Sequence, residues 1–263
     1  MSNRISPHIE VDALPEGERE SAKHMVHLVQ MLADYEARYA SACALHLHSW
    51  QRFLDLTPEI RKHTPLSDDW GVAFATRKTA GSWCDLAIRD AAFSIFHFYH
   101  VLDGITLGAR RVPTLFRMME VAELNKAQPA FKRRFPDPVR PRNAIEHEAE
   151  FSKTLDKANK HSFTKKTPFG QITVSGSLTT DASTTGFGLE SGSANDLPHS
   201  GRVLWQNIEG KLVRAELSPE GVACLKSVVD HVFDAFAPAA KKTWEMAAEA
   251  HARSLGISFP KGE

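Results

Sequence analysis

The chain has 263 residues, of which 42% are hydrophobic and 24% are charged, a composition typical of a globular protein. Lys plus Arg and Asp plus Glu both number 32, so the net charge gives no sign of a polyanionic partner. The charges are distributed unevenly, because Met1–Trp70 holds 11 acidic and 7 basic residues, whereas Lys126–Lys166 holds 11 basic and 5 acidic ones. Such a basic segment can attract phosphate or nucleic acid, although a solvated helix surface is the commoner explanation.

The three cysteines, Cys43, Cys84 and Cys224, lie far apart in the chain. Their spacing predicts neither a disulfide framework nor a zinc site, and buried free thiols are typical of a reducing cytosol. The N-terminal residues have no apolar signal core, and no stretch approaches the ~20 apolar residues that a membrane helix needs. We therefore expect a cytoplasmic protein that does not span a membrane.

Residues 1–15 contain two prolines and little periodicity, so we expect a flexible N-terminal arm. From about Glu18 to about Leu56 apolar residues recur every three or four positions, which predicts a long amphipathic helix unless it breaks near Ser41–Leu45. A Thr-Pro pair follows, and Pro58 would be a favourable first residue of the next helix.

The region from Trp70 to Gly108 is predicted to be the central helix. Between Leu86 and Leu102 its apolar residues occupy every face, which is typical of a helix buried on most sides. Further helices are expected over residues 113–127, 129–135, 141–159, 219–236 and 238–255.

The pattern changes after residue 168. Residues 169–178 alternate apolar and polar side chains as a strand does, and residues 202–208 and 211–217 flank Glu209-Gly210, a hairpin signal. A β element of this size is too small to stand alone and is expected to pack on the helices. The sequence therefore predicts a mainly α protein of the α+β class, a helical bundle with a small antiparallel β-hairpin or meander near 169–217, inserted in one domain of residues 16–263.

Chemistry is most concentrated in residues 142–147, Arg-Asn-Ala-Ile-Glu-His, directly after Pro141. Amides at a helix start lack intrahelical acceptors, so with Arg140 and Arg142 they would form an anion site. His147 could act as general acid or base, and Arg142 could hold a phosphate or a developing oxyanion. At ~100° per residue, however, Arg142 and His147 lie about 140° apart, so one helix does not aim both at one atom. The alternative is an i, i+4 ion pair of Arg142 with Glu146 and a half-buried His147.

These residues resemble the R-x4–6-H motif of HEPN domains, which are helical bundles, often dimeric. Many are metal-independent ribonucleases in toxin–antitoxin, abortive-infection and CRISPR systems. The resemblance implies that Arg142 and His147 are the catalytic pair of an endoribonuclease and Asn143 a supporting polar residue, with RNA or a nucleotide as partner and neither metal nor cofactor. It also implies a homodimer that brings two motifs together. A wider spacing, residues 87–92, 97–98 and 142–147, is similar to that of a group of bacterial proteins of unknown activity.

Asp90, Ser94 and His97 form a polar stripe on the central helix. A buried Asp90 could orient His97 toward His147, or it could pair with His97 or Arg142 in a structural network, which is the favoured interpretation. Two functional hypotheses therefore remain open. The first is an HEPN-like ribonuclease or nucleotide-binding protein. The second is a non-catalytic, homodimeric helical interaction protein in which these polar residues hold the core together.

Overall fold

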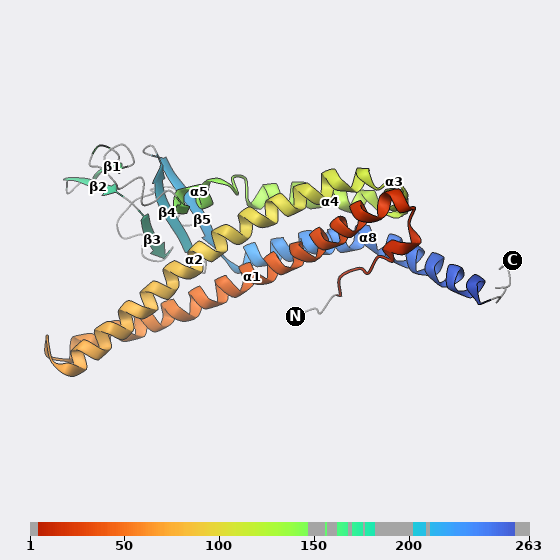
Figure 1. Cartoon of the computed structure of the whole chain (residues 1–263). Coiled ribbons are helices and arrows are strands. Elements are labelled where there is room, and N and C mark those ends of the chain that lie inside the picture. Colours follow the sequence, from red (N-terminus) through yellow and green to blue (C-terminus); the bar gives the residue numbers. More distant parts are fainter. Residues whose placement is uncertain are drawn as a thin grey trace. The chain divides into compact units, whose positions relative to one another are not determined.

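The structure, a computed structural model, describes residues 5–146, 156, 162–167, 170–175, 177–181, 202–208 and 211–255, with the backbone alone for 162–216. Figure 1 shows three long helices, α1 (Glu16–Lys62), α2 (Asp68–Gly108) and α8 (Pro219–Ser254). The short elements are η1 (Val11–Ala13), η2 (Ala109–Arg111), α3 (Pro113–Met118), α4 (Val121–Arg134) and α5 (Arg140–Glu146). The expectation of a mainly helical protein is confirmed. Over the described part of the chain, no helix combines the length and the apolar character that a membrane span requires.

Several predicted helix ends at prolines are wrong. α1 runs unbroken for 47 residues and passes through Pro58, and α8 is one helix through Pro238. A proline inside a helix removes one backbone hydrogen bond and costs ~3 kcal/mol. Packing on both sides offsets this cost, because Leu56 is buried before Pro58 and both Phe236 and Ala239 are buried around Pro238.

Contacts between residues divide the chain into two compact units. Unit 1 comprises Met1–Glu36, His97–Pro136 and Cys224–Glu263, and unit 2 comprises Ala37–Phe96 and Asp137–Ala223. α1, α2 and α8 therefore each contribute residues to both units. The predicted arrangement of one arm and one domain of residues 16–263 stays a prediction.

Unit 1 has a core of large side chains. The rings of Phe98 and Phe131 stack with their centroids 5.4 Å apart. The buried side chains around them come from α1, α2, α4 and α8: Met25, Leu32, Leu102, Ile105, Leu124, Val228, Val232 and Phe236.

The segment predicted to be a flexible arm is anchored to unit 1. Ile9 and Leu14 are only 4% and 2% exposed, and the backbone N–H of Glu10 donates to Thr243 Oγ1 at 3.2 Å. Directly after this segment, the Glu18 carboxylate accepts hydrogen bonds from the backbone N and the Oγ1 of Thr114, at 3.0 and 2.8 Å. Residues 5–15 thus contribute to the core of unit 1, and residues 1–4 lie outside the described residues.

In unit 2, α1 from Ala37 and α2 up to Phe96 form an antiparallel pair, which we call the hairpin. Its register is fixed by contacts such as the Cys84 Sγ to the His46 carbonyl, 4.0 Å, and the Arg77 guanidinium over the Phe53 ring, 4.1 Å. The buried side chains along the hairpin are mostly small, namely Ala42, Ser49, Ala73, Ala80, Cys84, Ala87, Ala91, Ala92 and Ser94. The larger ones are Tyr39, His46, Leu56, Ile88 and Ile95.

Unit 2 also contains two small antiparallel sheets. β1 (Ser162–Thr167) pairs with β2 (Gly170–Ser175), and β3 (Ser177–Asp181), β4 (Arg202–Ile208) and β5 (Lys211–Leu217) form a sheet in that order. In the β4–β5 ladder, Arg202 is opposite Leu217 and Ile208 is opposite Lys211. The predicted turn residues 209 and 210 lie outside the described residues, and so do the side chains of these strands apart from Leu217. The packing of a β-hairpin on the helices stays a prediction.

Candidate functional site

Arg142, the proposed catalytic cation, lies on α5 in unit 2 and is already engaged. Its guanidinium makes an ion pair with Glu146 four residues on and lies 4.9 Å from the ring centroid of Phe96. The Arg142 and Glu146 side chains are 28% and 34% exposed. The Nε–H of Arg142 is buried and has no hydrogen-bond partner among the described residues. A guanidinium neutralised and covered in this way is poorly placed to receive a phosphate.

The neighbouring residues of the motif make local contacts. Asn143 Oδ1 accepts a hydrogen bond from Arg142 Nη1 at 3.1 Å, and the backbone N–H of Asn143 donates to the Val139 carbonyl. α5 begins at Arg140, one residue before the predicted start, and Asp137 Oδ1 accepts from the Arg140 backbone N–H at 3.4 Å. Asp137 Oδ2 also lies 3.6 Å from Arg140 Nη1, so a carboxylate occupies the position predicted for an anion at Arg140.

His147, the other half of the predicted catalytic pair, lies outside the described residues, as do Glu148 and Glu150. The geometry between Arg142 and His147 therefore stays a prediction, and so does their joint role on RNA.

Asp90 is paired, but with neither of the partners expected for it. It forms an ion pair with Arg38 of α1, with Arg38 Nε donating to Asp90 Oδ1 at 2.6 Å. Ser94 Oγ donates to the backbone carbonyl of Asp90, one turn earlier in α2, at 2.8 Å. Arg38 and Asp90 both belong to unit 2, where their ion pair joins α1 to α2.

His97, the third residue of the stripe, belongs to unit 1. Its ring stacks on Tyr35 of α1 with centroids 5.2 Å apart and an interplanar angle of 16°. The stripe is therefore distributed over two separate sets of contacts, Asp90 with Arg38 and His97 with Tyr35.

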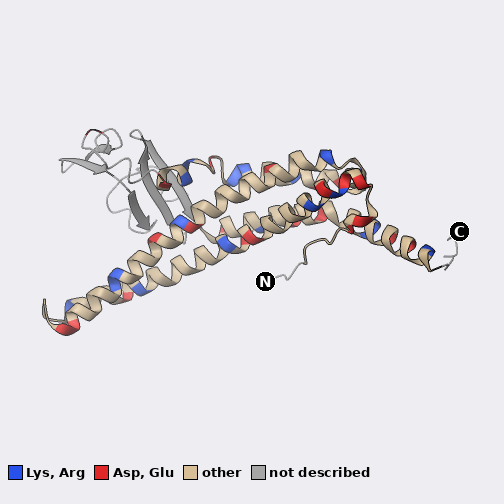
Figure 2. Cartoon of the chain, in the orientation of Figure 1, with Lys and Arg blue, Asp and Glu red and all other residues tan. Residues whose placement is uncertain are grey.

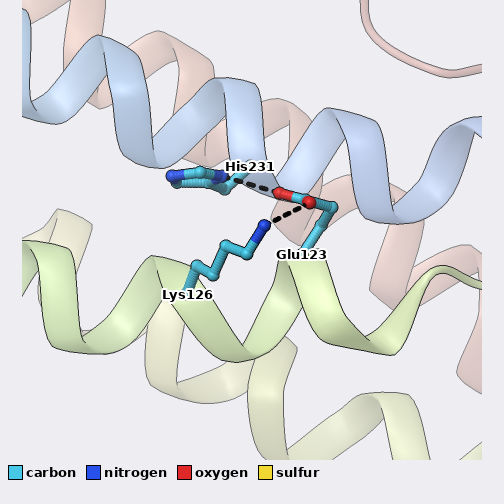
Figure 3. A network of polar contacts seen from close by, with 3 residues as sticks. All are labelled: Glu123, Lys126 and His231. Atoms are coloured by element: carbon cyan, nitrogen blue, oxygen red, sulfur yellow. Dashed lines mark hydrogen bonds and ion pairs between the residues drawn. The ribbon is translucent and has the colours of Figure 1, made fainter.

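A cluster that the sequence does not reveal joins α4 and α8 in unit 1. Figure 3 shows Glu123 between Lys126 and His231, with His231 Nδ1 2.9 Å from Glu123 Oε2 and Lys126 Nζ 2.6 Å from Glu123 Oε1. The Lys126 hydrogen bond, and then the His231 contact, lower the pKa of the Glu123 carboxyl. Glu123 and Lys126 are three residues apart, a pairing that the sequence can suggest, but His231 follows Glu123 by 108 residues.

A histidine oriented by a carboxylate is the kind of pair that acid–base catalysis uses. His231 is 29% exposed, and Glu123 is its hydrogen-bond partner within the described chain. The third member of the cluster, Lys126, contacts Glu123 from the same helix. The cluster is therefore best interpreted as a polar link between α4 and α8.

The remaining signals are structural. The aromatics Phe131 and Phe135, which flank the basic run of residues 132–134, are buried in unit 1 and so are not available to stack on bases. Among the residues that the structure describes, no group of three or more His, Cys, Asp or Glu side chains could hold a metal ion. Burial raises the pKa of the Cys224 thiol, which keeps it protonated at neutral pH.

The chain matches no family model, no curated protein and no solved structure.

Proposed function

We propose that the chain is a non-catalytic helical interaction protein and that the hairpin of unit 2 carries its interaction surface. The observation behind this proposal is a concentration of exposed large apolar side chains between residues 47 and 86. They are Leu47, Leu54, Leu66, Val72, Phe74, Trp83 and Leu86, with exposed fractions from 43% to 88%.

Apolar side chains exposed singly are ordinary, but seven of them on the two helices of the hairpin and the turn between these helices favour a binding surface there. The α1 helix of the hairpin supports this interpretation, because the 20 residues from Tyr39 to Pro58 include only two formal charges, Arg52 and Asp55. In Figure 2 this part of α1 is accordingly almost free of blue and red. An exposed helix needs charged side chains for solubility unless another surface covers it.

The ribonuclease hypothesis has less support from the geometry. It requires Arg142 to meet a phosphate, whereas its guanidinium already contacts Glu146 and Phe96. An incoming RNA would have to displace Glu146, whose negative charge also repels the RNA backbone.

Site-specific photo-cross-linking tests the proposal. A photoreactive phenylalanine analogue replacing Leu86 in the full chain should give cross-linked species in an extract of the source cells. The same analogue replacing Gln30, which is exposed on α1 in unit 1, is the matched control and should give none.

An RNA-cleavage assay completes the test. The proposal predicts that the purified chain does not cleave RNA. Cleavage that Arg142→Ala abolishes without changing the melting temperature, combined with no cross-link at residue 86, would overturn the proposal in favour of the ribonuclease.

A further inference from the structure

The start of α4 is bonded to α8 at the place where α8 contains a proline. Pro238 has no N–H to donate to the carbonyl one turn earlier, so the hydrogen bonding of α8 is interrupted there. The carbonyl of Ala235, within one turn of the proline, accepts the backbone N–H of Glu120 at 2.9 Å. Glu120 is the residue before α4, and an N–H at a helix start has no acceptor within its own helix. The backbone of α4 thus begins at the interruption in α8.

The contact of Glu123 with His231 lies next to this backbone bond on both helices. Glu123 follows Glu120 by three residues, and His231 precedes Ala235 by four, so each pair of positions shares one helix face. Figure 3 shows the His231 ring directed at the Glu123 carboxylate, with Nδ1 2.9 Å from Oε2. Side chains therefore reinforce the backbone bond one turn away from it.

The titratable groups on the turns of α4 and α8 that meet here are mostly acidic. They are Glu120, Glu123 and Lys126 on α4 and Asp230 and Asp234 on α8, and Glu36 of α1 interacts with Asp230. Lys126 and His231 hold the two oxygens of the Glu123 carboxylate and lower the pKa of this carboxyl. Glu123 is therefore ionised throughout the range in which imidazoles change charge.

Protonation of the ring changes the strength of its contact with Glu123. A neutral imidazole makes an ordinary hydrogen bond to a carboxylate, whereas an imidazolium makes a charge-assisted bond that is roughly twice as strong. Histidine side chains gain their proton between about pH 8 and about pH 5. The contact should thus be strongest in mild acid, and it should weaken again only where Glu123 is protonated, below the unfolded-state value of ~4.3.

We propose that the start of α4 is a pH-sensitive latch on α8, in which Glu123 and His231 secure the neighbouring bond of Glu120 to Ala235. In mild acid the charge-assisted contact holds the latch closed, and the latch loosens as the ring loses its proton. All four residues lie in unit 1, so the inference goes beyond the hairpin surface and does not rest on it.

The latch acts on the part of α8 that directly follows the interruption. Residues 239–242 lie between Pro238 and a second anchor at Thr243, whose Oγ1 accepts the backbone N–H of Glu10. Local opening of this short segment breaks the Glu120 bond and a few helical bonds but leaves the rest of the core intact. The charge on one imidazole can therefore set how often the segment opens.

Hydrogen exchange of the full chain tests the latch when it is followed at single amides by NMR and corrected for the intrinsic rate at each pH. The Glu120 amide reports the bond to Ala235, and the amides of residues 239–242 report the segment beyond Pro238. Both sets should be about fivefold better protected at about pH 5.5 than at about pH 8, as expected for gain of one charge-assisted contact.

Three variants identify the group that titrates. His231→Gln should abolish the pH dependence, because glutamine can still donate to Glu123 but does not change its charge. Glu123→Gln, which removes the charged acceptor, should abolish it as well, and it carries the test alone if circular dichroism shows that His231→Gln has lost helix content. His251→Gln is the matched control, because it makes the same change at an exposed position of α8, and it should keep the fivefold difference.

Three results would overturn the latch. The first is equal protection at the two pH values in the unaltered chain. The second is a pH dependence that persists in a folded His231→Gln or Glu123→Gln chain, which would assign it to another group. The third is a response of the Glu120 amide without one at residues 239–242, which would show that the contact does not control α8 beyond Pro238.

Discussion

Unit 1 and the hairpin of unit 2 are built from the same two helices but in opposite ways. In unit 1, α1 and α2 bury large side chains such as Met25, Leu32 and Phe98 against α4 and α8. In the hairpin most of the buried residues are small, such as Ala80, Cys84 and Ala87, although Tyr39 and Ile88 are buried as well, while Trp83 and Leu86 remain exposed. A continuous helix can therefore be buried in a core over one part of its length and present exposed apolar side chains over another.

The polar contacts of the two regions also differ, in how far apart along the sequence their partners lie. Unit 1 is linked across helices by Glu18 with Thr114 and by Glu123 with His231, residues about a hundred positions apart. In the hairpin, Arg38 pairs with Asp90 and Arg77 donates to Thr57 across the two helices, whereas Glu59 with Lys62 is a local pair. We therefore expect mutations to cost stability mainly in unit 1 and to affect association mainly in the hairpin.

The largest effect should come from truncating aromatic side chains in the two regions. Phe131 is fully buried against Phe98, so Phe131→Ala should lower the free energy of unfolding by about 3–5 kcal/mol. Trp83 is half exposed, so Trp83→Ala should cost far less in a monomer. Urea unfolding followed by circular dichroism, at concentrations too low for association, measures both. Equal losses of unfolding free energy would show that Trp83 is packed in the hairpin as tightly as Phe131 is in unit 1.

The next largest effect concerns a close approach inside unit 2. A Cβ on Gly221, in the first turn of α8, would lie 2.5 Å from the hydroxyl oxygen of Tyr39, a side chain that is fully buried and cannot withdraw. Gly221→Ala should therefore destabilise the protein by about 1–3 kcal/mol, as overpacking does. Gly71→Ala is the matched control, because nothing lies within 4 Å of its Cβ position, and it should stabilise α2 by up to ~1 kcal/mol.

The Gly221 prediction can be sharpened with a second variant. Tyr39→Phe removes the hydroxyl that would meet the new methyl group, so part of the Gly221→Ala loss should be recovered in the double variant. If the destabilisations of the two single variants simply add in the double variant, as measured by thermal unfolding, the Tyr39 hydroxyl does not contact the residue at position 221.

The course of the helices was largely readable from the sequence. The three-to-four-residue recurrence of apolar residues predicted α1 and α2, because it follows from burial of one helix face. The helix ends were misjudged at Pro58 and Pro238, because the penalty of a proline is local whereas the packing that offsets it comes from distant residues.

The contacts of the polar residues were less predictable. The i, i+4 pair of Arg142 with Glu146 was one of two open interpretations, since both partners lie on one short helix. The partner of Asp90 proved to be Arg38, 52 residues away, and only the register of the hairpin brings the two together. No local pattern in the sequence could have indicated His231 as the partner of Glu123.

A smaller effect is expected where the predicted catalytic residue is replaced. If Arg142 is structural, Arg142→Ala should lower the free energy of unfolding by ~1 kcal/mol, the sum of a half-exposed ion pair and a cation–π contact. Arg140→Ala, which removes only an exposed pair with Asp137, is the control and should change stability by less than ~0.5 kcal/mol. Thermal unfolding measures the stability of both variants. An unchanged melting temperature for Arg142→Ala would contradict a structural role for this residue.

The smallest effect distinguishes the polar contacts of the two regions through their pH dependence. Hydrogen bonds from Lys126 and His231 lower the pKa of Glu123, and a hydrogen bond from Lys62 lowers the pKa of Glu59. A carboxyl whose pKa is lower in the folded than in the unfolded state, where it is ~4.3, stabilises the protein above that pH. The contribution is lost as the pH falls through the folded-state pKa.

Glu123→Gln should therefore be destabilising near neutral pH and nearly neutral in acid, where the carboxyl of the unaltered chain is protonated as well. Glu59→Gln is the matched control in the hairpin, because its carboxyl has one partner on its own helix whereas Glu123 is held from both α4 and α8. Urea unfolding at a series of pH values measures the difference in unfolding free energy between each variant and the unaltered chain. As the pH falls, this difference should decrease more for Glu123→Gln than for Glu59→Gln. An identical pH dependence of the two variants would mean that the bond to His231 adds nothing to a local surface pair, and the contrast between the two regions would then rest on their apolar packing alone.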